Sequence, residues 1–169
     1  IGAVRIPKDG NDADYVASEN VHLVAEISDS NPYLNEAITV VYKMYVSHDV
    51  SITSNWRELD IPKYADFWSQ NIDSKGNYKI YDGTYNGEDY RYVILRTTVL
   101  YPQKTGKLNI EPLTLDIPID VPGSRRDLFG RRLITRVNKT ISAGNRSINV
   151  RPLPIEGKPD NFTGAVGKF

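Results

Sequence analysis

Apolar and polar residues alternate along much of the chain, which is the pattern of β-strands with one buried face. The alternation is regular over residues 21–27, 36–47, 90–101 and 113–121. It is weaker over four further stretches, which are residues 51–60, 108–110, 133–141 and 147–151. Together they predict seven to nine strands.

Residues 90–101 are apolar on nearly both faces, with Val93, Leu95, Thr97, Val99 and Tyr101 expected on one of them. A strand of this kind is typical of the centre of a sheet. Pro118 interrupts the cleanest one-sided strand and has no amide hydrogen to donate. We therefore expect it at a sheet edge, or with its nitrogen directed outward.

Turn sequences separate the strands, including Asp82-Gly83 and Asn86-Gly87, which suit tight hairpins. Residues 61–72 break the alternation, and Pro62 is expected to open a short helix there. The sequence predicts an all-β fold, an immunoglobulin-like antiparallel β-sandwich with at most one short helix. A closed barrel is the alternative.

The two ends differ in character from the middle. Residues 1–20 are polar, and we interpret them as a connector or the tail of a preceding domain. Residues 21–155 are expected to form the sandwich. From Pro152 on, Pro and Gly dominate and periodicity stops, which indicates that residues 156–169 are a linker to a following domain. Because the chain starts at Ile1, we interpret it as a segment of a longer protein.

Composition narrows the possible functions of the 169 residues. There is no cysteine, which excludes disulfides, thiolate metal sites and a cysteine nucleophile. Lys+Arg and Asp+Glu number 21 each. A neutral chain argues against nucleic acid as a partner, since that would require an excess of cations. No apolar run reaches the length of a membrane helix.

Catalytic and metal-binding patterns are weak. His22 and His48 are expected to be ordinary solvated side chains, because a triad or a metal site requires converging partners. Asp9, Asn11, Asp12 and Asp14 resemble the start of a calcium loop but lack its later glycine and glutamate. A polar connector is the favoured interpretation. We therefore expect no enzyme activity, no metal and no cofactor.

Two groups of residues are candidates for binding. The first is a basic loop at residues 122–132, which can dock onto an acidic protein patch or anionic headgroups, or can simply be solvated. Its candidate residues are Arg125, Arg126, Phe129, Arg131 and Arg132, with Arg136 and Lys139 following. The second group is Trp56, Phe67 and Trp68, which can form a hot spot or a sugar platform. For Phe67 and Trp68 we favour a place in the core.

Three phrases carry a resemblance to a known family. They are NPYLNE at residues 31–36, LYPQKTGKL at 100–108, and a closing stretch with Pro152-Leu153-Pro154, Lys158-Pro159 and NFTGAVGKF at 161–169. In this order they resemble the BatD family of Bacteroides aerotolerance, or oxygen-tolerance, proteins. The closing phrase is the most specific of the three.

The resemblance implies an internal domain of a protein at the periplasmic face of the inner membrane. Anchoring would come from a C-terminal helix outside this segment. Implied partners are envelope proteins, including von Willebrand A-like and TPR-type companions, and no catalytic residue is implied. From this we expect a non-catalytic scaffold domain that binds through sandwich edges and loops. The alternative is a carbohydrate-binding β-sandwich module of a glycan-utilisation system, which an exposed aromatic platform would favour.

Overall fold

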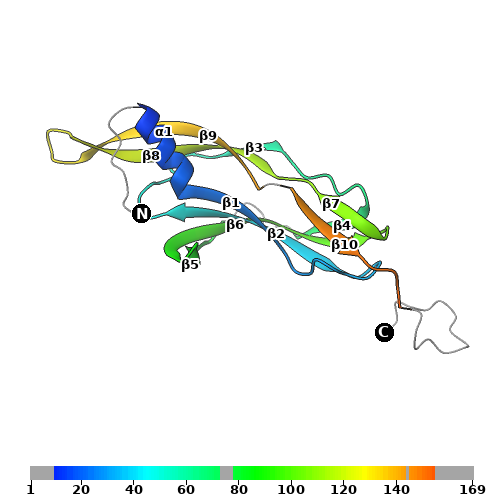
Figure 1. Cartoon of the computed structure of the whole chain (residues 1–169). Coiled ribbons are helices and arrows are strands. Elements are labelled where there is room, and N and C mark those ends of the chain that lie inside the picture. The colour runs from blue at the N-terminus through cyan, green and yellow to red at the C-terminus, as the bar shows by residue number, and fades with distance from the viewer. Residues whose placement is uncertain (1–9, 73–77, 144, 155–169) are drawn as a thin grey trace, which may run out of the picture.

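The computed structural model describes residues 10–72, 78–143 and 145–154, with side chains from residue 13 onward. They form a β-sandwich of two antiparallel layers, with one helix at one end (Figure 1). The first layer has the order β1–β2–β6–β4, and β5 also pairs with β6. Its strands are β1 (Val21–Ile27), β2 (Ile38–Ser47), β4 (Phe67–Ile72), β5 (Ile80–Tyr85) and β6 (Glu88–Pro102).

The second layer is a long ribbon with one short edge strand. Its wider part has the order β3–β8–β9, and the pair β7–β10 continues it. Between the two parts, the amide of Ala143 donates to the carbonyl of Leu113 at 3.0 Å. The strands are β3 (Arg57–Asp60), β7 (Gly106–Ile110), β8 (Thr114–Arg126), β9 (Arg132–Ser142) and β10 (Arg146–Val150).

The described residues hold ten strands, and β4 and β5 account for the excess over the sequence prediction. Both are short strands that share one edge of β6. In β4 only Phe67 is buried, so burial does not alternate along it. The prediction of a short helix within residues 61–72 is therefore wrong. A turn precedes β4, and residues 67–72 form a strand because they pair with β6.

The prediction that residues 90–101 form a central strand is confirmed, since β6 pairs with β2, β4 and β5. A β-bulge at Leu95 changes its faces, because Tyr42 pairs with Arg96 whereas Lys43 pairs with Ile94. Val93 lies beside buried Met44, but after the bulge Thr98 lies beside buried Val40. The expectation of one face running from Val93 to Tyr101 is wrong, because the extra residue reverses the alternation.

Pro118 lies where its missing amide hydrogen costs nothing. β8 pairs with β9 on one side, and on the other side it pairs with β3 near Asp116 and with Ser51 at Asp120. The Asp120 amide donates to the Ser51 carbonyl, away from β9. Backbone nitrogens two residues apart on a strand point the same way. The Pro118 nitrogen therefore also points away from β9, between the contacts of β8 with β3 and with Ser51, as predicted.

Residues 10–20 form the helix α1 (Gly10–Asn20), so for these residues the expectation of a connector or a preceding-domain tail is wrong. Ala13, Val16 and Ala17 follow helical spacing and are buried in the same core as both layers. α1 contacts β1, β2, β8 and β9, so it covers the side of the sandwich between the two layers. The folded unit therefore includes α1.

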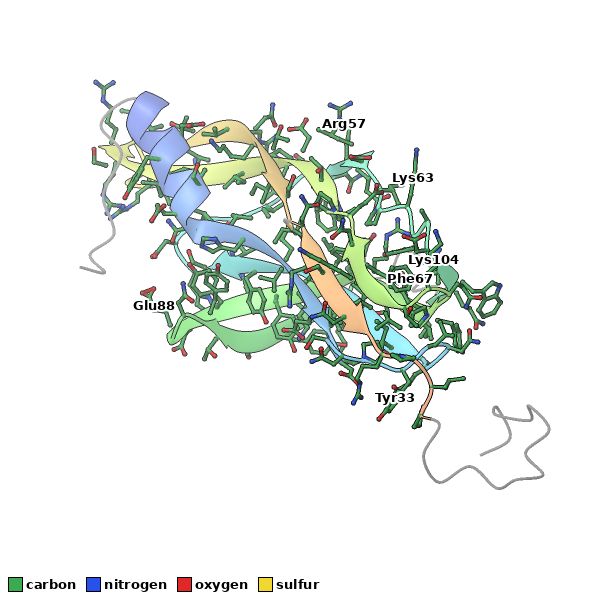
Figure 2. All side chains as sticks on the ribbon, turned by 45° about the vertical axis from the view of Figure 1, so that its right-hand side comes forward. Tyr33, Arg57, Lys63, Phe67, Glu88 and Lys104 are labelled. Atoms are coloured by element: carbon green, nitrogen blue, oxygen red, sulfur yellow. The ribbon has the colours of Figure 1, made fainter. Side chains whose placement is uncertain are left out.

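The last described residues are fastened at the opposite end of the sandwich. Arg151 bridges to Tyr33, and its guanidinium carbon lies 3.9 Å from the centroid of the Tyr33 ring. Figure 2 shows Tyr33 at the end where the described chain stops, remote from the β5–β6 turn that carries Glu88. The predicted linker at 156–169 lies outside the described residues. Within them, no helix has the length and hydropathy needed to cross a bilayer.

Candidate interaction surfaces

The β8–β9 hairpin extends beyond the other strands at the end near α1 (Figure 1). Strand pairing continues to Arg126 and Arg132, so the expectation of a loop over residues 122–132 is wrong except for a short turn. We call residues 125–132 the hairpin tip. The structure brings together there Arg125, Arg126, Arg131 and Arg132, with Phe129 between the two pairs.

Asp127 organises the hairpin tip. Its Oδ1 accepts from the amides of Phe129 at 2.8 Å and Arg131 at 2.9 Å, and its carbonyl accepts from Gly130 at 3.1 Å. Gly130 has a φ of 80°, the left-handed conformation that closes such a turn. The tip is therefore a defined turn that presents residues 128 and 129 at its apex.

The apex is apolar and open to solvent. Leu128 is 100% exposed and Phe129 is 81% exposed. Single exposed apolar residues are common, but two adjacent ones at the end of a projecting hairpin are typical of a contact surface. The Arg131 guanidinium carbon lies 5.4 Å from the Phe129 ring centroid, which holds a cation beside the aromatic ring.

Cations surround the apex, and most lack an anionic partner. Arg126 and Arg132 lie directly opposite each other on the two strands of the hairpin. Two like charges in this position destabilise the strand pair. Arg131 pairs with Asp127 at 3.1 Å. Within the described part of the chain, no carboxylate lies within ion-pair distance of Arg125, Arg126 or Arg132. The tip therefore carries net positive charge that a negative partner surface would neutralise.

Arg136 and Lys139, the last cations of the basic stretch, serve the fold instead. Arg136 Nε donates to buried Asp120 at 2.7 Å, and Thr53 donates to the same carboxylate at 2.5 Å. These hydrogen bonds lower the pKa of Asp120. Lys139 pairs with Asp14 on α1 at 3.0 Å. The sequence alone did not separate these two ion-paired cations from the four at the tip.

The structure does not bring Trp56, Phe67 and Trp68 together. Phe67 is buried, as expected, whereas Trp68 is 57% exposed, so its predicted core position is wrong. β4 is an edge strand, and Trp68 faces away from the second layer against Tyr101, with 5.1 Å between ring centroids. Trp56 is half-buried and packs against Tyr78 at 5.2 Å.

An aromatic cluster on the outer face of the first layer was not predicted. His22, Tyr45, Tyr92 and Tyr81 lie directly opposite one another across β1, β2, β6 and β5. Tyr85 stacks on His22 with 4.2 Å between centroids, so His22 is not an isolated solvated side chain. Tyr45 is only 8% exposed. The rings pack on one another, and Tyr81 at the edge of the cluster stays exposed.

The calcium-like pattern finds no counterpart in the described side chains. Asp14 is engaged with Lys139, while Asp9 lies outside the described residues and the side chains of Asn11 and Asp12 do too. Among the side chains that are described, no group of three or more His, Cys, Asp or Glu residues could hold a metal ion.

A second surface that the sequence did not reveal is a pocket of about 420 Å³ between β2, β5, β6 and the segment after β2. It combines apolar side chains with Arg91. The signal in the sequence was a pair of arginines, Arg91 and Arg96, within an otherwise apolar central strand.

No protein-family model matches the chain, and no curated protein matches it with significance. Among solved structures, a cohesin module from a family 33 glycoside hydrolase of Clostridium perfringens is similar, with a TM-score of 0.35 and 7% identity over 79% of this chain and 98% of that chain. The assignment as a β-sandwich stands on the strand pairing itself.

Proposed function

We propose that this chain is a non-catalytic interaction domain that docks onto an acidic surface of a partner protein through the hairpin tip. The observation that carries the proposal is the exposed pair Leu128 and Phe129, surrounded by four arginines. Arginine and aromatic side chains dominate the energetics of protein interfaces. A rigid hairpin also loses little conformational freedom on binding.

The features of the tip complement one another. The apex supplies apolar area, and the arginines behind it supply charge that can steer an acidic partner. The juxtaposition of Arg126 and Arg132 costs stability in the free domain. A carboxylate-rich partner surface would remove that cost on binding.

The wider assignment rests on the resemblance to BatD proteins. In this proposal the domain is a scaffold at the periplasmic face of the inner membrane, within a longer protein held by a C-terminal helix outside this segment. Its partners are envelope proteins, with von Willebrand A-like and TPR-type proteins as the first candidates. The alternative is a carbohydrate-binding module, which the exposed Trp68 beside Tyr101 favours, whereas the burial of Tyr45 counts against a sugar platform at the centre of the aromatic cluster.

Affinity capture from detergent-solubilised envelope, followed by mass spectrometry, tests the proposal. Two variants of the tip are compared with the natural chain: charge reversal to Glu at Arg125, Arg126, Arg131 and Arg132, and the double substitution L128S/F129S. The matched control reverses four exposed cations elsewhere, which are Arg57, Lys63, Lys104 and Lys107. Figure 2 shows Arg57, Lys63 and Lys104 in the half of the molecule away from the tip.

We expect the natural chain and the control to retain an envelope protein that both tip variants lose, with affinity lowered about tenfold or more. Equal capture by all four proteins would refute the proposal. Sedimentation with phosphatidylglycerol vesicles distinguishes the membrane alternative. If the tip binds such vesicles without any protein, the docking surface is a lipid contact and the protein-partner proposal is wrong.

A further inference from the structure

The pocket lies on the inner face of the first layer, between β2, β5, β6 and the segment after β2. Met44, Val46 and Val93 form the part contributed by β2 and β6, and Ile52 and Trp56 contribute from the segment after β2. A volume of about 420 Å³ is within the range of small-molecule sites. The apolar lining favours a ligand with an apolar body.

Two apolar side chains stand exposed beside this pocket. Tyr78 is 45% exposed and Ile80 is 68% exposed, and both belong to its lining. Tyr78 is positioned by Trp56, whose ring centroid is 5.2 Å away. Burial of these surfaces against a ligand would gain hydrophobic free energy that the free domain does not realise.

Arg91 gives the pocket its charge. Among the described lining residues it is the one Lys, Arg, Asp or Glu, and it lies on the inner face beside Val46. Arg96 is also on the inner face of β6, but it pairs with Glu58 at 3.1 Å. Arg91 has no ion pair within the described residues, although Asp82 lies directly opposite it on the neighbouring strand β5.

The guanidinium of Arg91 is held in place by the backbone. Its Nη2 donates to the carbonyls of Ser47, at 3.3 Å, and Val50. An arginine has five N–H donors, so these contacts leave donors on Nε and Nη1 for a ligand. A fixed guanidinium at the side of an apolar pocket is suited to a carboxylate, which it can bind with two parallel hydrogen bonds.

We propose that this pocket binds a small amphipathic carboxylate, with its apolar body between Trp56 and Val93 and its carboxylate on Arg91. The shape, the apolar lining and the Arg91 guanidinium each specify one part of such a ligand. The site is independent of the hairpin tip, so its test and the test of the proposed function can fail separately.

Decanoate, below its critical micelle concentration, is the probe, and tryptophan fluorescence is the readout. The chain has two tryptophans, so W68F leaves Trp56 as the sole reporter. Decanol has the same alkyl body without the charge. We expect a saturable change in Trp56 emission with decanoate, and binding of decanol weaker by roughly tenfold or more.

Substitution at the exposed Ile80 tests the location without disturbing the core. In the W68F background, I80D should weaken decanoate binding by roughly tenfold, because it removes apolar contact and adds a like charge. I72D, at a similarly exposed isoleucine on β4, should leave binding unchanged. R91Q should bind decanoate and decanol with equal affinity. Circular dichroism reports whether this variant folds. If it does not fold, the comparison of I80D with I72D tests the proposal.

The proposal is overturned by any of three results. One is the absence of a saturable change in Trp56 emission, and another is equal affinity for decanoate and decanol in the W68F protein. The third is an equal effect of I80D and I72D.

Discussion

The ring of Tyr92 lies directly over Gly83. A Cβ atom added to Gly83 would stand 2.9 Å from Cε1 of Tyr92, closer than such contacts allow. Tyr92 is also wedged between Tyr45 and Tyr81, with centroids 5.2 Å away on each side. The absence of a side chain at residue 83 therefore makes room for the aromatic cluster on the outer face.

Gly83→Ala should destabilise the fold by about 1–3 kcal/mol, the usual cost of overpacking a site whose neighbours cannot move freely. Urea denaturation measures the loss, and near-ultraviolet circular dichroism should report the displaced tyrosines. Gly123→Ala is the control, since its Cβ would meet the Leu133 carbonyl oxygen at 3.4 Å, an ordinary contact. Equal stabilities of the two variants would show that the Tyr92 ring can move aside without loss of unfolding free energy.

Tyr42→Phe should remove a link between the layers. The hydroxyl of this fully buried tyrosine donates to the Glu111 carbonyl at 3.1 Å. The expected loss in unfolding free energy is about 0.5–1.5 kcal/mol. Tyr101→Phe, whose hydroxyl makes no hydrogen bond within the described structure, should change stability less. A larger loss for Tyr101→Phe would contradict this assignment.

The same tyrosine predicts a limit at high pH. Burial raises the pKa of Tyr42 above its usual value of about 10. The folded state therefore keeps Tyr42 protonated where the unfolded chain begins to ionise, and stability should fall as the pH rises above about 10. Thermal melts of the natural chain and Tyr42→Phe should differ less as the pH rises through this range, and parallel curves would rule out Tyr42 as a cause.

Asp120 predicts the opposite behaviour at low pH. The hydrogen bond from Arg136 lowers the pKa of this carboxyl, so the folded state binds a proton less readily than the unfolded chain does. The resulting stabilisation is complete above the unfolded pKa of about 3.9 and is lost as the pH falls through the lower folded value. Asp120→Asn should thus lower the Tm at neutral pH, with a deficit that shrinks below about pH 4.

Asp116→Asn is the matched control for that experiment. Asp116 lies on the same strand and pairs with the exposed guanidinium of Arg57 at 3.1 Å. Exposed ion pairs contribute little, so we expect a small change in Tm. A Tm deficit for Asp120→Asn that does not vary with pH would show that the Asp120 carboxylate charge is not what stabilises the fold.

α1 should be essential for the stability of the sandwich. Ala17 is fully buried against both layers, so Ala17→Asp places an unpaired charge in the core, and unfolding or a loss of several kcal/mol is expected. Glu19→Asp introduces the same residue at an exposed position of the helix and should be nearly neutral. Folding of both variants with equal Tm would mean that α1 is only loosely attached.

The sequence was sufficient for the sandwich, the central position of β6 and the outward nitrogen of Pro118, because each follows from local alternation or backbone chemistry. It was insufficient for α1. There the polar residues 8–14 concealed the helical spacing of Ala13, Val16 and Ala17. It also missed the bulge at Leu95, because a bulge depends on the register with β2.

The candidate sites divide in the same way. The run of basic residues along the sequence was enough to single out the basic stretch. It included the four arginines and Phe129 that the hairpin brings together. It could not show that Arg136 and Lys139 are held by Asp120 and Asp14, since those partners are distant in sequence. The pocket was missed because Arg91 meets Trp56 and Tyr78 only through tertiary packing.

Photocrosslinking in cells tests the docking role of the hairpin tip most directly. p-Benzoylphenylalanine would replace Phe129 in one strain and Trp68, which is 57% exposed, in a second. We predict a discrete crosslinked envelope protein from residue 129 that the charge reversal of the four tip arginines abolishes, and no such product from residue 68. The same product from both positions, or none from residue 129, would contradict the account.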